Sequence, residues 1–246
     1  MTKNEEKTVY LDYAATTPLA SEIFHQMQPY FTEYFANPSS PYSLAKYQRT
    51  VVDTARQEIA SALATKPDSI IFTSGGTESD NLAVFGIARR YQDKGKHIIT
   101  TAVEHEAVIK PAKQLEKEGF NVTYLPVNRH GEVALDDIRN ALRPDTILIS
   151  IMYANNEIGT IQPIAEIGAV VSEWRENNKT VYPYFHTDAC QAASTLSLNV
   201  EKLKVDLMTL NGSKIYGPKG VGILYRRKGI GLQPQVLGGG QEYGLR

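Results

Sequence analysis

The sequence predicts an α/β fold: a mostly parallel seven-stranded sheet with helices on both faces. Short apolar runs alternate with amphipathic segments from residue 69 onward, the pattern of strands joined by crossover helices. Small polar residues follow the apolar runs, and in parallel sheets this edge carries the ligand site. The sequence of 246 residues contains no internal repeat, no low-complexity segment and no linker that would divide it.

The elements are expected in the following order. A short extended segment over 9–13 precedes a helix from Ser21 toward Tyr34, which Pro29 interrupts. After a break at 37–41, a long amphipathic helix turns an apolar face inward, formed by Leu44, Tyr47, Val51, Ala55, Ile59 and Ala62. Strands are expected at 69–73, 97–100, 122–125, 146–152, 184–187, 205–210 and 221–225. Helices follow the first four of these strands, over residues 82–88, 107–118 and 135–142 and from Pro163 onward.

Composition limits the class of protein. The formal net charge is -1 and no basic tract is present, so neither nucleic acid nor an anionic membrane is an expected partner. The polar start, residues 1–7, lacks the apolar stretch of a signal peptide, and no apolar run approaches the ~18 residues of a spanning helix. The single cysteine, Cys190, excludes an internal disulfide and a multi-cysteine metal site, and no metal is expected. These features indicate a cytoplasmic protein.

The first strand end carries a candidate phosphate site. Gly75 and Gly76 allow a tight turn into the next helix, whose free N–H groups suit a phosphate. Thr77 and Asp80 have capping-box spacing, so an ordinary capped helix is an equally good interpretation. The absence of G-x-G-x-x-G and of a P-loop motif argues against a dinucleotide or a nucleoside triphosphate.

Later strand ends supply groups with more than one interpretation. His105 is suited to stack on a flat ligand or move protons, although a structural histidine is the more common case. Asn155 and Asn156 are typical of a turn. Asp188 suits a protonated ring nitrogen, with Gln191 near a ring substituent, or else Asp188 is the N-cap of a helix.

The sixth strand end delivers Asn211, Ser213 and Lys214 into a loop rich in Gly and Pro. A lysine held there and shielded from water can form a Schiff base with a carbonyl, whereas an isolated loop lysine is usually solvated. A phosphate site, a histidine, an acid and a lysine along one sheet edge are what pyridoxal 5′-phosphate requires.

Six motifs in order resemble those of cysteine desulfurases in the class V aminotransferase family. They are Asn37-Pro38-Ser39-Ser40, residues 74–81, Glu104-His105, residues 155–159, residues 188–191 and residues 214–220. The resemblance implies a fold-type I pyridoxal phosphate transferase, with residues 1–16 as an arm of the small domain and 17–246 as the cofactor-binding large domain. Most of the small domain is not expected within this sequence.

The resemblance also implies a role for each matching residue. Lys214 holds the cofactor and moves the substrate α-proton, Asp188 pairs with the ring nitrogen, and Gln191 contacts the ring hydroxyl. His105 stacks on the ring and assists proton transfer. The phosphate contacts are assigned to Gly76, Thr77, Asn211 and Ser213. Asn155 is placed beside both the cofactor and the substrate carboxylate, and Asn37 is a second substrate contact.

The implied reaction converts L-cysteine to L-alanine and leaves the sulfur as an enzyme persulfide for iron–sulfur cluster assembly. A sulfur acceptor or iron–sulfur scaffold protein and a second copy of the chain, in a homodimer, are the implied partners. Alternatives are a selenocysteine lyase, an aminotransferase and a non-catalytic scaffold that binds the cofactor.

The sequence departs from the family pattern in several places. Ser213 replaces the usual His, Asn211 replaces Ser, and Tyr42 replaces a frequent His. Cys190 occupies the variable position of Asp-Ala-x-Gln, where a small packed residue is expected. The nucleophilic cysteine loop, the carboxylate-binding arginine and the Arg-x-Gly-Thr segment have no match, so the chain alone is expected to be inactive or weakly active.

Overall fold

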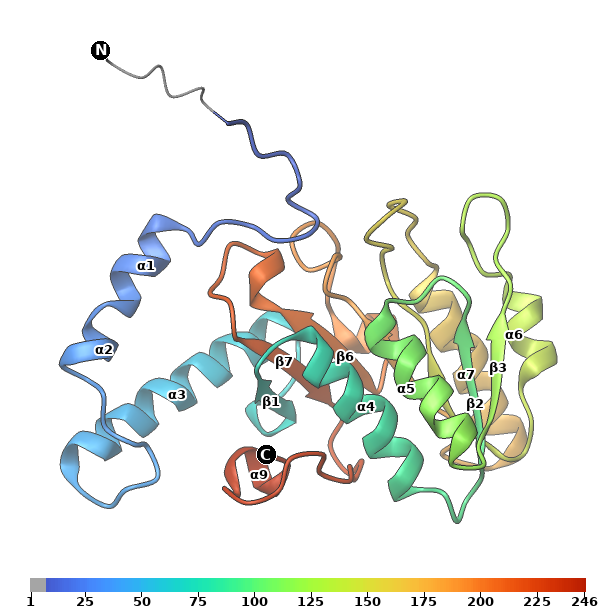
Figure 1. The fold of residues 1–246 in the computed structure, drawn as a ribbon. Coiled ribbons are helices and arrows are strands. Elements are labelled where there is room, and N and C mark those ends of the chain that lie inside the picture. The colour runs from blue at the N-terminus through green and yellow to red at the C-terminus, as the bar shows by residue number, and fades with distance from the viewer. Residues whose placement is uncertain (1–7) are drawn as a thin grey trace.

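A single seven-stranded sheet organises residues 8–246, the part of the chain that the computed structural model describes (Figure 1). The strand order is β1-β7-β6-β5-β4-β2-β3, and β7 runs antiparallel to both neighbours while the remaining pairs are parallel. The predicted mostly parallel sheet is confirmed. The strands are β1 (Ile70–Thr73), β2 (His97–Thr101), β3 (Asn121–Leu125), β4 (Thr146–Ser150), β5 (Tyr184–Asp188), β6 (Leu207–Asn211) and β7 (Gly222–Arg226).

Helices cover both faces of the sheet (Figure 1). One face packs against α4 (Gly76–Arg90) and α5 (Glu106–Lys117). The other packs against α3 (Ser43–Ala62), α6 (Leu135–Ala141), α7 (Ile164–Asn178) and α8 (Val200–Leu203). Every residue of β2, β4 and β5 is buried, because helices lie above and below these central strands.

The N-terminal helices partly match expectation. Pro29 divides the predicted helix into α1 (Ser21–Met27) and α2 (Pro29–Thr32), because its ring cannot continue the hydrogen bonding of α1. Figure 1 shows both helices standing away from the sheet. The polar leader 1–7, and with it the start of the arm predicted over 1–16, lies outside the described residues, and the domain division at 16/17 stays a prediction.

The apolar stripe predicted for α3 is only partly buried: Ile59 packs against the core and Val51 and Ala55 are half-buried, but the rest of the stripe is exposed. The buried residues of α3 are Ala45, Gln48, Arg56 and Ala60, whereas Leu44 and Tyr47 are 37% and 47% exposed. Arg56 turns inward because its guanidinium donates to Ile70 O at 2.6 Å and pairs with both carboxylate oxygens of Glu242, at 2.7 and 2.8 Å. The ion pair with Glu242 thus buries Arg56, a residue next to the predicted apolar stripe.

One smaller correction concerns a helix end. Pro163 is the N-cap of α7 rather than its first residue. Short elements without a sequence signal complete the fold: the 3-10 turns η1 (Pro67–Ser69) and η2 (Gly212–Lys214), and α9 (Gln241–Gly244). Over residues 8–246, no helix has the length and apolarity needed to cross a membrane.

Candidate active site

A cavity of about 530 Å³ opens where the strands predicted to carry the site end. Its walls come from the segments that follow β1, β2, β4, β5 and β6, joined by residues 12–15 of the N-terminal arm. The structure therefore brings together residues that lie far apart in the chain. The predicted site residues that line the cavity are Gly76, Thr77, His105, Asp188, Gln191, Asn211, Ser213 and Lys214.

The first turn of α4 forms one end of this cavity. Gly75 is the N-cap with φ 155°, a conformation that favours glycine, and no side chain caps the helix. The predicted capping box was wrong: Thr77 lies inside the helix, and Glu78 Oε2 accepts from Ser74 N at 2.8 Å instead. The start of α4 is thus built from glycines and has the N–H groups and dipole that bind an anion.

Gly76 leaves space that a side chain would fill. A Cβ there would lie 2.9 Å from Cys190 Sγ and 3.6 Å from Asn211 Nδ2. Asn211 Oδ1 accepts from the backbone N–H of Ser213 at 3.2 Å and from its hydroxyl at 3.1 Å. Asn211 therefore orients Ser213 while its own amide group faces the glycine turn.

Lys214 is held by the N-terminal arm. Its Nζ donates to Ala14 O at 2.8 Å and to Ala15 O at 2.6 Å. Gln191 Nε2 also donates to Ala14 O, at 2.8 Å, and Thr17 N donates to Ser213 O at 2.9 Å. The amine is half-buried at the cavity wall, in contrast to a freely solvated loop lysine.

Asp188 ends β5 and is buried. Its Oδ1 accepts from Cys190 N at 2.9 Å, and the residues that follow form turns rather than a helix. The N-cap interpretation of Asp188 therefore does not apply. Asp188 lines the cavity.

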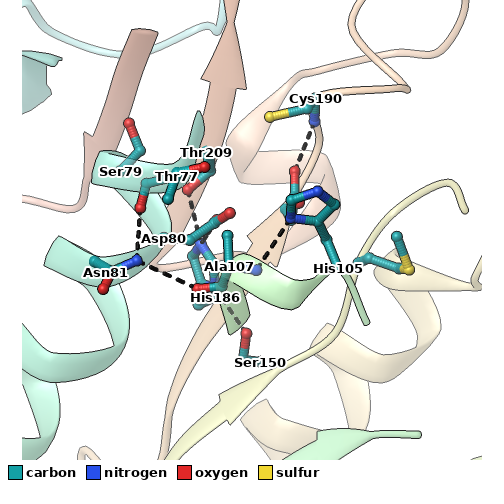
Figure 2. A network of polar contacts seen from close by, with 12 residues as sticks. Thr77, Ser79, Asp80, Asn81, His105, Ala107, Ser150, His186, Cys190 and Thr209 are labelled. Carbon is teal, nitrogen blue, oxygen red and sulfur yellow. Dashed lines mark hydrogen bonds and ion pairs between the residues drawn. The ribbon is translucent and has the colours of Figure 1, made fainter. Parts of the chain in front are cut away.

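His105 has a structural contact as well as a place at the cavity rim. It is the N-cap of α5, and its Nδ1 accepts from Ala107 N at 3.1 Å (Figure 2). Because Nδ1 acts as the acceptor, the neutral ring carries its proton on Nε2. The cap thus fixes the tautomer of an exposed histidine beside the cavity.

The two residues predicted to contact substrate do not line the cavity wall. Asn155 is buried, with Oδ1 accepting from the N–H groups of Glu157 and Ile158 at 2.8 and 3.0 Å and Nδ2 donating to Val103 O at 3.0 Å. This is the turn role that adjacent asparagines indicate, and Asn156 lines the cavity instead. Asn37 is exposed and its Oδ1 accepts from Ser39 N at 2.9 Å. The substrate roles of Asn155 and Asn37 stay predictions.

Two buried carboxyl groups near the cavity were missed as functional candidates. Asp80, which lines the cavity, was assigned to the capping box. Glu104 Oε1 accepts from Thr101 Oγ1 at 2.7 Å and from Met152 N at 2.9 Å, and burial raises its pKa to about 8. The signal that could have found them is an acidic residue in the segment that follows a buried strand: Glu104 follows β2, and Asp80 lies near the start of α4 after β1.

Cys190 is the packed residue that its position in the motif predicts. It is buried, with its sulfur against Gly76. Burial raises its thiol pKa well above the ordinary value, and Asp188 and Asp80 raise it further. A neutral, enclosed thiol is a poor nucleophile. Within residues 8–246, no group of three or more His, Cys, Asp or Glu residues is arranged to hold a metal ion.

The fold and the cavity define a class of protein. A lysine, a buried aspartate and an uncapped helix N-terminus surround one cavity at the carboxyl edge of an α/β sheet, the arrangement of pyridoxal phosphate enzymes. The chain belongs to the aminotransferase class-V family, whose model matches residues 9–244.

Curated relatives narrow the class. The chain is 52% identical to cysteine desulfurase IscS of Dictyoglomus turgidum over 241 residues, covering 98% of this chain and 59% of the relative. It is 52% identical to cysteine desulfurase IscS of Methanosarcina thermophila over 238 residues, covering 97% of this chain and 57% of the relative. The chain thus spans somewhat more than half the length of these relatives. Cysteine desulfurases are pyridoxal 5′-phosphate-dependent enzymes.

Solved structures agree with this assignment. A protein described as a NifS-like protein matches with a TM-score of 0.92 at 39% identity, over 97% of this chain and 64% of its own. SspA in complex with cysteine matches with a TM-score of 0.91 at 41% identity, over 97% of this chain and 67% of its own.

Proposed function

We propose that this chain supplies the cofactor-binding part of a cysteine desulfurase. The observation that carries the proposal is the convergence of Lys214, Asp188 and the glycine turn of α4 on one cavity. The cysteine desulfurases among its relatives and the solved relative described with bound cysteine support the same function. The proposed substrate is L-cysteine.

The residues of the cavity fit pyridoxal 5′-phosphate. The space beside Gly76 and the uncapped start of α4 suit a phosphate group, with Thr77, Asn211 and Ser213 as hydroxyl and amide donors. Ser213 brings no positive charge to the phosphate, so the helix N-terminus supplies most of the attraction.

Three further side chains suit the ring. Asp188 would pair with the ring nitrogen and His105 would lie at the ring face, with Gln191 near the ring hydroxyl. When bound, the cofactor supplies an electron sink for the bonds of the substrate α-carbon. Lys214 would hold the cofactor through its amine and afterwards move the α-proton, a role that requires release of Nζ from the arm carbonyls of Ala14 and Ala15.

The proposed overall reaction transfers the substrate sulfur to a thiol. The carbon–sulfur bond of L-cysteine breaks, a proton replaces sulfur on the carbon to give L-alanine, and the acceptor thiol becomes a persulfide. Cys190 is not the acceptor in this proposal, because its thiol is buried against Gly76 and protonated. The acceptor thiol therefore lies outside the sequence given, and the chain alone is inactive or weakly active.

The wider setting is also proposed. The cysteine desulfurase IscS relatives support delivery of sulfur to an acceptor or scaffold protein of iron–sulfur cluster assembly. The proposed state is a cytoplasmic homodimer. Apolar side chains exposed between residues 23 and 47, such as Phe31 and Phe35 at 70% and 69%, offer surface for a second polypeptide.

The test combines covalent capture of the cofactor with sulfide release. Pyridoxal 5′-phosphate is added to the purified chain, borohydride fixes it, and peptide mass spectrometry reads which lysine is modified. Modification of Lys214 is expected in the wild type and in Lys219→Ala, a matched change in the same loop, and no fixed cofactor in Lys214→Ala. Unmodified wild type, or undiminished labelling in Lys214→Ala, refutes the cofactor role.

Sulfide release distinguishes the remaining candidates. A thiol-containing reductant and L-cysteine are added to the cofactor-loaded chain, and both sulfide and alanine are measured. Slow or absent release is expected from this chain alone. Faster formation of alanine from selenocysteine than from cysteine would favour a selenocysteine lyase. Transamination products would favour an aminotransferase.

A further inference from the structure

Figure 2 shows a polar network around His186, which reaches the cavity through Asp80 and has no role in the proposed function. His186 on β5 has hydroxyl groups beside both ring nitrogens: Nδ1 is 2.8 Å from Ser150 Oγ, and Nε2 is 3.0 Å from Thr209 Oγ1. Asp80 on α4 approaches the same ring, with Oδ1 3.7 Å from Nε2. All four side chains are almost completely excluded from solvent.

This network lies directly beside Asp188. His186 and Asp188 are two residues apart on β5, so their side chains share one face of the sheet. Thr209 on β6 is the register partner of Asp188. Asp80 and Asp188 both line the cavity. Two carboxyl groups therefore line the same cavity.

Among residues 8–246, no Lys or Arg forms an ion pair with Asp80. Its Oδ1 has no hydrogen-bond partner within the described residues, although the side chain is only 1% exposed. Burial lowers the His186 pKa to about 3, so the ring is neutral at physiological pH. The other ionisable groups around Asp80 are Asp188, Glu104 and the Cys190 thiol, and Lys214 reaches the same cavity.

These surroundings decide where a proton resides. Burial raises the pKa of Asp80 well above its ordinary value, and Asp188 and Glu104 raise it further, against a smaller lowering by the Thr209 hydroxyl. Asp188, by contrast, has a hydrogen-bond donor, because its Oδ1 accepts the backbone N–H of Cys190. Asp80 is the more deeply buried of the two carboxyl groups and has an oxygen without a donor, so Asp80 carries a proton.

We propose that Asp80 is a positioning residue for Asp188. Asp80 lies between His186 and the cavity and is neutral. It excludes water from beside Asp188, so that Asp188 is the single carboxylate facing the ring nitrogen of the cofactor. The proposal deepens the proposed function and rests on it for the role of Asp188. It also predicts that Asp80 is protonated in the chain without cofactor, and this protonation is tested separately.

The first test uses stability and needs no cofactor. Urea unfolding of the wild type, Asp80→Asn and the exposed control Asp136→Asn is measured from pH 5 to pH 8. A proton held only in the folded state lowers the wild-type folding constant by about tenfold per pH unit above the unfolded pKa. The folding constant of Asp80→Asn relative to wild type should therefore rise with pH, by up to about tenfold per unit. A ratio that is flat or falls with pH overturns the proposal.

The second test measures the effect on the cofactor. Pyridoxal 5′-phosphate affinity and the pH profile of its absorbance are compared in wild type, Asp80→Asn, Asp80→Ala and Asp188→Asn. Asp80→Asn should match wild type within about threefold, because asparagine keeps the neutral shape. Asp80→Ala should weaken binding by about tenfold and shift the absorbance profile, since water reaches Asp188.

The outcomes separate the two claims. If Asp80→Asn loses cofactor and shifts the profile as Asp188→Asn does, Asp80 works as a carboxylate and the proposal is overturned. If Asp80→Ala leaves both affinity and profile unchanged, Asp80 does not position Asp188 and the proposal is again overturned. If the wild type binds no cofactor, the proposed function fails, and with it the role toward Asp188, whereas the unfolding series still decides the protonation of Asp80.

Discussion

Replacing Gly76 by alanine tests the glycine turn of α4 in isolation. The added methyl group would lie 2.9 Å from Cys190 Sγ. Non-bonded carbon contacts are comfortable at about 3.5–4.0 Å, so the overlap is roughly 0.6–1.1 Å. The sulfur sits in a buried pocket, and relief requires a shift of Cys190 or of the helix start. Overpacking of this kind costs about 1–3 kcal/mol of unfolding free energy.

A double-mutant cycle identifies the sulfur as the source of the strain. Cys190→Ala removes the clashing atom, so Gly76→Ala/Cys190→Ala should recover much of the loss, with an interaction energy of about 0.5–3 kcal/mol. Urea unfolding of the four proteins gives the unfolding energies, and a pyridoxal 5′-phosphate titration gives the affinities. Additive changes in unfolding free energy, with no recovery in the double mutant, would refute the close contact between Gly76 and Cys190.

Three further predictions follow from buried or capping contacts. The pKa of Glu104 is raised from 4.5 to about 8, so the folded state keeps a proton that the unfolded state loses, and stability falls as pH rises through this window. Glu104→Gln should remove the part of this dependence that Glu104 causes, about 5 kcal/mol by urea unfolding from pH 4.5 to 8, and leave the part that Asp80 causes; an unchanged slope would contradict it. Glu242→Ala should lower the free energy of unfolding by about 3–5 kcal/mol in thermal or urea unfolding, because it leaves Arg56 as a buried unpaired cation. A loss below 1 kcal/mol would show that water solvates Arg56 instead. His105→Ala should cost about 1 kcal/mol by removing the acceptor for Ala107 N, and His105→Asn should restore stability but not the ring contact with cofactor; equal stability of both variants in urea would refute the cap.

Local chemistry explains why the sheet was predictable. β4 has an apolar centre, Ile147-Leu148-Ile149, between polar residues, so its position follows from burial on both faces of the sheet. The reversal of β7 depends instead on which strands meet, and the sequence carries no signal for it. The same limit applies to α3, where pairing with Glu242, far along the chain, buries Arg56 next to the predicted apolar stripe.

Only part of the candidate site could be predicted from the sequence. Lys214, Asp188 and Gly76 follow from strand ends, because those ends must meet at one edge of the sheet. The contacts of Lys214 with Ala14 O and Ala15 O are not predictable, since backbone carbonyls of an arm leave no trace in residue type. Asp80 was misassigned because its spacing from Thr77 imitates a cap, and only burial shows its surroundings.

The antiparallel pairing of β1 with β7 has a consequence for the order of folding. β1, which leads into the glycine turn of α4, pairs only with β7, so Ile70 must wait for Tyr225 to be synthesised before its strand has a neighbour. Gly75 is also packed against Gly222, where a Cβ would lie 2.5 Å from Gly75 Cα. During synthesis, β2, β4 and β5 can assemble first. The glycine turn of α4 reaches its final packing only after β7 has been made. A nascent chain released before β7 emerges would hold a partial sheet without its anion site.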